Sequence, residues 1–273
     1  MAATWRPLLY GSSYSKVTKK LYLANCMKRI AAILSILVMA ASCWQGPSTL
    51  VLCTFNVHHC EPTEDGGRCY GELERLFGEL GPDVVALQEL DSCNARSGEY
   101  QAAELGARCG VEYLYHRTIP FGGGSYGLGM LYKPSLKLVD TAILPLPGAE
   151  PRGALVAEFE GFVYVSTHLC FKSEENRRES ITILSDWLSE RYKGKPVFLA
   201  GDLNCTDILD YANEWEAFST DEDTFGHDGA GGRIDYILQL RSGKGASLKS
   251  SRVVAEAAGL SDHLPVVSVV LLK

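Results

Sequence analysis

Short β-rich apolar runs recur along residues 50–273, and several of them end in polar side chains. The run VFLAGDLN at residues 197–204 is the clearest case, because a stretch that looks like a buried strand finishes with Asp202 and Asn204. Asp and Asn commonly end strands by hydrogen-bonding the nearby backbone, so a turn is the simplest interpretation. A reaction centre at the carboxyl end of the strand is the alternative. It predicts matching polar residues at other strand ends.

Segments with strand character outnumber those with helical spacing. The expected strands cover residues 51–55, 84–90, 125–132, 154–158, 162–168, 197–204, 233–240 and 265–272. Helical spacing of apolar side chains predicts helices over residues 71–80, 99–108 and 174–192. Some neighbouring strands look antiparallel. We therefore expect an α/β chain with two packed β-sheets and helices outside them, rather than a singly wound sheet.

The first 42 residues differ in kind from the rest. Lys28 and Arg29 precede the apolar stretch 30–41, which is followed by small residues. A basic start, a short apolar stretch and small residues predict a secretory signal, and the stretch falls short of the roughly 20 residues of a spanning helix. We expect residues 1–42 to be an N-terminal extension with a signal peptide and residues 43–273 to be one catalytic domain. Met27 is an alternative start.

The end of the predicted signal also resembles a bacterial lipobox. Ala40-Ala41-Ser42-Cys43 has the small residues and the cysteine of such a site. Lipidation of Cys43 would make the protein a periplasmic or cell-surface lipoprotein associated with a membrane. A plainly secreted protein and an uncleaved anchor are the alternatives.

The charge of residues 43–273 is strongly acidic. Residues 1–42 hold six basic and no acidic side chains, so 20 basic and 33 acidic side chains remain, a formal charge of −13. Such a surface repels polyanions on average, whereas non-specific duplex DNA binders usually have the opposite balance. Nucleic acid is therefore a less favoured partner, although a local basic patch or a bound cation would override the average.

The cysteines have no metal-site spacing. Seven follow Cys43, and no CxxC motif occurs among them, which argues against a zinc site. Export would permit disulfides, and Cys60–Cys69 and Cys93–Cys109 are the pairs to test first. Unpaired buried cysteines are the simpler expectation, because the core looks large enough to need no bridges.

Polar side chains that can serve chemistry stand at the ends of most expected strands. They are Asn56, Glu89 after Gln88, His168 after Thr167, Asp202 with Asn204, Asp235, and Asp262 with His263. Each alone has a structural explanation, such as a strand-end cap or a surface carboxylate. Together they indicate a functional centre, because buried charged groups are costly unless they serve each other or a metal.

These residue types favour one kind of chemistry. Oxygen-bearing ligands indicate a hard divalent cation, Mg²⁺ or Mn²⁺, and Glu89 with Asp262 or Asn56 would suit Mg²⁺, which keeps several waters. Such a cation neutralises charge that develops on phosphoryl oxygens, and a histidine–aspartate pair can activate a water. The set therefore predicts hydrolysis of a phosphate ester.

Seven segments in chain order resemble the endonuclease/exonuclease/phosphatase superfamily, which has the DNase I-like fold. They are TFNVHHC (54–60), PDVVALQELD (82–91), GGSYGLGMLY (123–132), STHL (166–169), LAGDLN (199–204), RIDYIL (233–238) and LSDHLPVV (260–267). The resemblance spans about residues 50–273. Each segment is weak alone, but QE, GDxN and SDH in that order are jointly specific. The chain is most similar to short exported bacterial members.

The resemblance implies a four-layer α/β/β/α sandwich, in which two packed mixed sheets are flanked by helices and the site lies at one edge of the sheets. It implies Glu89 as the main metal ligand, with Asn56 and Asp262 beside the metal.

The resemblance also implies catalytic roles. Asp202 and Asn204 match residues that position water and bind the scissile phosphate, and alternation along the strand would point both at it. Asp235 and His263 match an acid–histidine pair that activates water. His168 matches a second histidine that binds phosphate or assists the leaving group.

Three further residues are expected near the substrate. Tyr126 lies near where some members of the superfamily place a side chain that supports the second histidine. Arg152 and His58 are candidates for substrate contacts. The remaining histidines, which we expect to be surface or structural residues, are His59, His116 and His227.

The resemblance implies a Mg²⁺- or Mn²⁺-dependent phosphoric ester hydrolase, a phosphodiesterase or phosphatase. Together with the acidic surface and the predicted membrane anchor, it leads us to expect a small or lipid phosphate ester as the substrate. A DNase I-like endonuclease is the alternative hypothesis, because some secreted nucleases of the superfamily are acidic. A non-catalytic binding module is a third hypothesis, and the intact set of polar residues argues against it. The substrate, the number of metals and the oligomeric state stay open.

Overall fold

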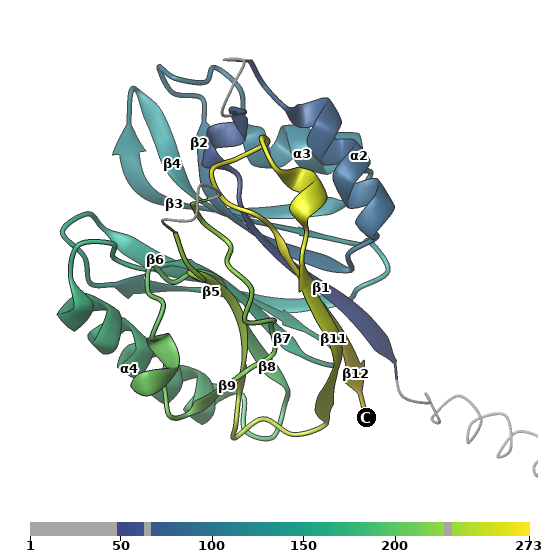
Figure 1. Cartoon of the computed structure of the whole chain (residues 1–273), viewed down its shortest axis with the longest axis vertical. Helices are drawn as coiled ribbons and strands as arrows, with labels where there is room; N and C mark the ends of the chain where they lie inside the picture. The colour runs from purple at the N-terminus through teal and green to yellow at the C-terminus, as the bar shows by residue number, and fades with distance from the viewer. Residues whose placement is uncertain (1–47, 63–66, 227–230) are drawn as a thin grey trace, which may run out of the picture. The chain divides into compact units, whose positions relative to one another are not determined.

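Two six-stranded sheets form the body of the protein in the computed structural model, which describes residues 48–62, 67–226 and 231–273 (Figure 1). The first sheet contains, in spatial order, β11 (Ala246–Val253), β12 (Val266–Leu272), β1 (Thr49–Asn56), β2 (Val84–Ser92), β4 (Gly124–Tyr132) and β3 (Glu112–Phe121). The second contains β5 (Leu138–Leu146), β6 (Arg152–Phe159), β7 (Val163–His168), β8 (Val197–Asp202), β10 (Asp235–Leu240) and β9 (Trp215–Ala217).

The two sheets pack face to face through a shared apolar core. Leu52 and Met130 of the first sheet belong to the same buried cluster as Phe198 and Ile237 of the second. Side chains alternate between the two faces of a strand, so every second residue of the central strands enters this core. The hydroxyl of Tyr164 crosses the interface and donates a hydrogen bond to the carbonyl oxygen of Cys53 at 2.7 Å.

Helices cover the outer faces of the sheets (Figure 1). α2 (Tyr70–Leu80) and α3 (Gln101–Cys109) pack on the first sheet, and α4 (Glu174–Arg191) packs on the second. Gly81, in the left-handed conformation at φ 59°, ends α2, and the Ser173 side chain caps α4 by accepting from the backbone N–H of Asn176. The predicted fold class, a four-layer α/β/β/α sandwich, is confirmed.

The strands that the sequence did not reveal are those at the sheet edges. β11 and β3 are the edges of the first sheet, and β5 and β9 are the edges of the second. An edge strand has a neighbour on one side only and is often charged, so its apolar alternation is weak. The residues of β3 and β11 are indeed mostly exposed or half-buried.

Parallel pairing brings the polar strand ends together. β1 pairs with β2, and β7 pairs with β8, in parallel, which places their carboxyl ends at one rim. His168 lies opposite Asp202 in this register. β10 is antiparallel to β8, so Asp235 at its first position reaches the same rim and pairs with Asp202.

Several predictions concern residues outside the described ranges. The signal peptide, Cys43 and His227 all lie there. Among the described residues, no helix combines the length and the apolar character that crossing a membrane requires. The seven cysteines within the described ranges are all free thiols, so the pairs Cys60–Cys69 and Cys93–Cys109 are not bonded.

Candidate active site

Asp202, the last residue of β8, is the centre of a buried polar cluster. Its Oδ2 atom accepts a hydrogen bond from Asn56 Nδ2 at 3.1 Å. The same oxygen lies 3.3 Å from His168 Nε2 and 3.7 Å from His263 Nε2. Within the described ranges, these two histidines are the only basic side chains within ion-pair distance of Asp202. Three strands, β1, β7 and β8, and the loop before β12 therefore meet at one carboxylate oxygen.

His263 is held by the other carboxylate of this cluster. Its Nδ1 atom lies 2.8 Å from Oδ2 of Asp235, and Thr224 Oγ1 donates to the same oxygen at 2.7 Å. The backbone N–H of His263 donates to Ser261 Oγ, which itself donates to the carbonyl oxygen of Asn56. With Nδ1 engaged in this way, Nε2 is the ring atom that faces Asp202.

Glu89 reaches the cluster because β2 contains a bulge. The register between β2 and β4 shifts between Leu87 and Leu90, and Glu89 has φ 63°. A positive φ is costly for a residue with a side chain, and bulges redirect side chains near functional sites. Glu89 Oε1 thereby accepts a hydrogen bond from Asn56 Nδ2 at 3.1 Å.

Asn204 reaches the site by a different route from the one expected. β8 ends at Asp202, and Asn204 has φ 51°, so strand alternation does not set its orientation. Its backbone N–H donates to Asp202 Oδ1 at 2.9 Å, and its Nδ2 donates to the carbonyl oxygen of Leu169 at 3.1 Å. Asn204 therefore orients Asp202 and ties the end of β8 to the loop after β7.

Gly201 permits the close approach of β7 and β8. It has φ 151°, and a Cβ atom at this position would run into the carbonyl oxygen of Thr167. Only glycine fits such contact. The close approach sets His168 beside Asp202.

Burial and neighbouring charges separate the pKa values in this cluster. Burial raises the pKa of Asp202 to about 7, with Asp235 adding to the rise. Burial alone would lower the pKa of His263, but Asp235 and then Asp202 raise it to about 10. Burial, Arg152 and His263 hold the pKa of His168 well below its ordinary value. At neutral pH His263 is therefore cationic, His168 is neutral and Asp202 titrates.

The three predicted metal ligands are not equivalent in the structure. Asn56 donates from Nδ2 to both carboxylates, and its Oδ1 accepts from the backbone N–H of His58 at 3.2 Å, so that oxygen is engaged. Asp262 Oδ1 lies 3.2 Å from Ser261 Oγ, whose proton is closer to the carbonyl oxygen of Asn56. In the described part of the chain, no three His, Cys, Asp or Glu side chains are grouped as a metal would need.

A hydrated divalent cation nevertheless fits beside Glu89. The Glu89 side chain is 18% exposed and lines a cavity of about 260 Å³. Its strained backbone holds a carboxylate there, and Mg²⁺ keeps several waters and is often bound by one or two carboxylates. Glu89 is thus the residue of this chain best placed to hold such an ion.

Each of the three predicted substrate residues neighbours one residue of the site. Tyr126 lies in the Glu89 cavity with its ring 5.6 Å from that of His59, so it neighbours a different histidine from the one expected. Arg152 is buried, and its charge acts on His168. His58 follows Asn56 and its ring lies 4.8 Å from that of His59.

Two side chains at the site had no sequence signal. His59, which we expected to be surface or structural, is buried, with Nε2 3.6 Å from Glu89 Oε2. It occupies a turn in which His58, His59 and Cys60 all have positive φ, a conformation that the sequence HHC does not announce. Thr224 supports Asp235 from a loop, where its polarity is unremarkable.

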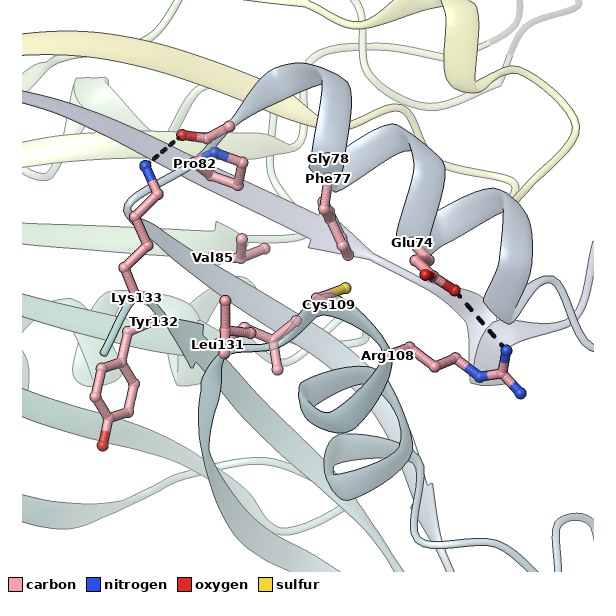
Figure 2. Close-up of a pocket in the computed structure, with 12 residues that line it drawn as sticks. Glu74, Phe77, Gly78, Pro82, Val85, Arg108, Cys109, Leu131, Tyr132 and Lys133 are labelled. Atoms are coloured by element: carbon pink, nitrogen blue, oxygen red, sulfur yellow. Dashed lines mark hydrogen bonds and ion pairs between the residues drawn. The ribbon is translucent and has the colours of Figure 1, made fainter. Parts of the chain in front are cut away.

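A second cavity lies away from this cluster and differs in character. It has about 370 Å³ and is floored by Val85 and Leu131 beneath α2 and α3. Figure 2 shows Glu74 and Arg108 pointing toward one another on its rim. Arg108 Nη1 lies 3.9 Å from Glu74 Oε2. The polar cluster around Asp202 contributes no residue to it, so the cavity is not the candidate site.

Comparison with known proteins identifies the family. The model of the endonuclease/exonuclease/phosphatase family matches residues 53–263. The chain belongs to this family. Members of the superfamily are phosphoester hydrolases. The cluster around Asp202 therefore belongs to a family of enzymes that hydrolyse phosphoester bonds.

Individual relatives are distant. "Uncharacterized protein YbhP" of Escherichia coli K12 is 22% identical over 167 residues, 55% of this chain and 65% of the relative, so the match spans less than two thirds of that protein. A mannosyl-6-phosphatase from Bacteroides thetaiotaomicron VPI-5482 is 19% identical with a TM-score of 0.68, covering 82% of this chain and 100% of that one. D. rerio TDP2, complexed with a single-strand DNA product, is 18% identical with a TM-score of 0.66, covering 82% and 99%. These structures share the fold.

Proposed function

We propose that this protein is a Mg²⁺-dependent phosphoesterase that acts on a small or lipid phosphate ester by direct attack of water. One observation carries the proposal. His168, His263 and the amide of Asn56 converge on Asp202 Oδ2, while the same amide contacts Glu89. A proton acceptor, a cationic donor and a carboxylate suited to a divalent ion thus meet within one hydrogen-bonded cluster.

The pKa values assign the proton-transfer roles. Asp202, with a pKa of about 7, accepts the proton of the attacking water at neutral pH. His263, with a pKa of about 10, stays protonated and stabilises negative charge on the phosphoryl oxygens. The sequence had suggested that the Asp235–His263 pair itself activates water. In this proposal Asp235 instead keeps His263 cationic and oriented.

The remaining groups position the substrate. His168 is neutral, and its Nε2 can donate to a phosphoryl or leaving-group oxygen. Asn204 fixes Asp202 through its backbone N–H. A divalent cation at Glu89 would supply charge neutralisation on the phosphoryl oxygens.

The excess of acidic over basic side chains favours a small or lipid substrate over nucleic acid. Residues 43–273 carry a formal charge of −13, which repels a polyanion on average. A nuclease is the second candidate function, because the structurally similar D. rerio TDP2 has been solved in complex with a single-strand DNA product. Export, with lipidation of Cys43, belongs to the same proposal, because it would place the enzyme at a membrane.

A substrate panel tests the proposal. The purified chain is assayed with Mg²⁺, with Mn²⁺ and after exhaustive chelation on p-nitrophenyl phosphate, bis-p-nitrophenyl phosphate, sphingomyelin and plasmid DNA. We expect cation-dependent hydrolysis of one of the small or lipid esters. Activity that persists after chelation would refute the metal-dependent mechanism, and plasmid nicking that His263→Ala abolishes would establish the nuclease instead.

Metal binding is measured separately from activity. Glu89→Gln keeps the size of the side chain and removes its charge, so we expect weaker binding of Mn²⁺ by calorimetry. Glu79→Gln, an exposed position on α2, is the matched control. Equal Mn²⁺ affinity of the two variants would argue against Glu89 as the ligand.

A further inference from the structure

A buried guanidinium with incomplete hydrogen bonding lies at the start of β6. Arg152 is 7% exposed, and its Nε atom is buried without a partner among the described residues. Its nearest carboxylate is that of Glu150, at 3.4 Å from Nη2, and the Glu150 side chain is 36% exposed. A buried cation needs a close counter-charge and satisfied donors. A partly solvated Glu150 supplies only part of this, so the site favours a further anion.

A cavity of about 270 Å³ opens beside Arg152. Its lining comprises Ala149, Glu150, Arg152, Cys170, Phe171 and Lys172. Lys172 is exposed and brings a second positive charge, with its Nζ 5.1 Å from the Phe171 ring. One water takes about 30 Å³ of the liquid, so the cavity has room for a phosphate or carboxylate group with some hydration.

N–H donors gather around the Cys170 thiol in the lining of this cavity. Burial alone would raise its pKa, but N–H donors from the backbone and from Asn176 hold the pKa below the ordinary value. The backbone donors are Ala149, Lys172 and Ser173. Two of them lie at the amino end of α4, where the helix dipole also favours an anion.

The cavity is a neighbour of the catalytic cluster and not a part of it. Cys170 follows His168 by two residues, so their Cα atoms are at most about 7 Å apart. The charge of Arg152 reaches His168 and lowers its pKa. Arg177 Nη1 donates to the carbonyl oxygens of Cys170 and Phe171, at 2.9 and 3.3 Å, which fixes the connecting loop.

We propose that the cavity around Arg152 and Lys172 binds a second anionic group of the substrate. The enzyme then prefers phosphate esters that carry another phosphate or a carboxylate a few bonds away from the ester that is cleaved. This inference rests on the proposed phosphoesterase function, and it narrows the substrate class. Glu150 holds Arg152 in place when no anion is bound.

The direct test compares substrates that differ only in the second anion. Alkyl monophosphates of three to six carbons are assayed against the α,ω-bisphosphates and the ω-carboxyalkyl phosphates of the same length, at fixed ionic strength. We expect kcat/KM to be about ten-fold or more higher for at least one dianionic series, the scale of one charge-assisted hydrogen bond. The two dianionic series distinguish a phosphate site from a carboxylate site.

Variants localise the preference to this cavity. Lys172→Ala should lower the ratio of kcat/KM for dianionic to monoanionic substrates several-fold, and Lys172→Arg should restore it. Lys249→Ala, at an exposed lysine on β11, is the matched control and should leave both values unchanged. Glu150→Gln should raise the ratio, because it removes the competing carboxylate. A wild-type ratio near one, or a raised ratio that Lys172→Ala leaves intact, would overturn the proposal.

Binding separates this inference from the proposed function. An alkane bisphosphonate, which cannot be hydrolysed, should bind about ten-fold or more tightly than the matching monophosphonate in calorimetry, and Lys172→Ala should remove the difference. If the protein hydrolyses none of the esters but this difference is present, the proposed function fails and the anion site stands. If the phosphonates bind equally, the anion site fails whatever the activity.

Discussion

Two buried carboxylates near the rim of the sheets have opposite environments. Asp91 in β2 accepts two hydrogen bonds from Arg96, both at 2.8 Å, and one from Asn94 at 2.7 Å. Asp202 in β8 has two histidines and an amide around Oδ2, and a second carboxylate, Asp235, opposite it in the register. Burial acts on both residues, but only Asp91 has a guanidinium to balance its charge.

The difference appears in the pKa values. Burial would raise the pKa of Asp91, yet the hydrogen bonds from Arg96 and Asn94 hold it below its ordinary value. Burial and Asp235 raise the pKa of Asp202 to about 7. A carboxylate that is paired with an arginine stays ionised and fixes a loop. A buried carboxylate without a paired arginine can instead gain and lose a proton near neutral pH. Burial alone therefore does not distinguish a structural acid from a functional one.

The largest expected effect is on activity at the Asp202 cluster. His263→Ala removes the cation that Asp235 holds, so we expect kcat/KM to fall by about 10²–10³-fold, the usual scale for a group that stabilises charge in the transition state. The assay is p-nitrophenol release from the best p-nitrophenyl substrate. His116→Ala, on the edge strand β3, is the control and should change the rate by less than about three-fold. Equal losses in the two variants would mean that His263 acts only through the fold.

The next effect is on stability at Asp91. Asp91→Asn replaces an acceptor of Arg96 by a neutral amide, so we expect the free energy of unfolding to fall by about 1.5–3 kcal/mol, the range for hydrogen bonds to charged groups. Arg96 is 29% exposed and can recruit water, which limits the loss. Urea denaturation measures it. An unchanged midpoint and slope would show that the ion pair contributes nothing.

The pH dependence of stability should run in opposite directions for the two acids. The lowered pKa of Asp91 stabilises the fold above the ordinary value of about 3.9, and this contribution disappears as the pH falls below it. The raised pKa of Asp202 makes ionisation unfavourable in the fold, so its cost grows from about pH 4 to about pH 7.

Metal-free urea denaturation from pH 3 to pH 8 checks both signs. The lower free energy of unfolding of Asp91→Asn, compared with wild type, should disappear as the pH falls below about 4. Asp202→Asn should gain stability relative to wild type as the pH rises from about 4 to about 7. Parallel curves for the two variants would remove the distinction between the two carboxylates.

The smallest expected effect comes from Thr224, a loop residue that holds Asp235 in place. Thr224 Oγ1 donates to Asp235 Oδ2 and accepts from the backbone N–H groups of Ile234 and Asp235. Thr224→Val keeps the shape but removes these bonds, so we expect a loss of about 1 kcal/mol in stability and a several-fold fall in kcat. Thr224→Ser should restore both. A failure of serine to restore kcat would point to packing as the cause.

The central strands were predictable because both of their faces are buried. The segments that became β1, β2, β8 and β12 are apolar runs bounded by turn signals, and parallel pairing then requires their carboxyl ends to share a rim. The edge strands were not predictable, because solvent on one side removes the apolar pattern. The site residues Asp202, Asp235 and His263 were predictable for the same reason, because each lies in or next to a central strand.

Backbone irregularities explain what the sequence concealed at the site. The bulge that redirects Glu89 and the left-handed turn that buries His59 depend on non-local packing, and neither has a motif. Asn204 follows Asp202 by two residues, but its side chain is oriented by the hydrogen bond that it donates to the carbonyl oxygen of Leu169. Such features occur where regular strand pairing is interrupted and a side chain is thereby redirected toward a functional site.

The central claim is that Asp202 is the proton acceptor and Asp91 is not. The most direct measurement is kcat/KM of Asp202→Asn and Asp91→Asn on the same p-nitrophenyl ester, at pH 7 with saturating Mg²⁺ and at a temperature where both remain folded. We predict a loss of about 10²-fold or more for Asp202→Asn and less than ten-fold for Asp91→Asn. An Asp202→Asn variant that keeps near wild-type activity would contradict the account.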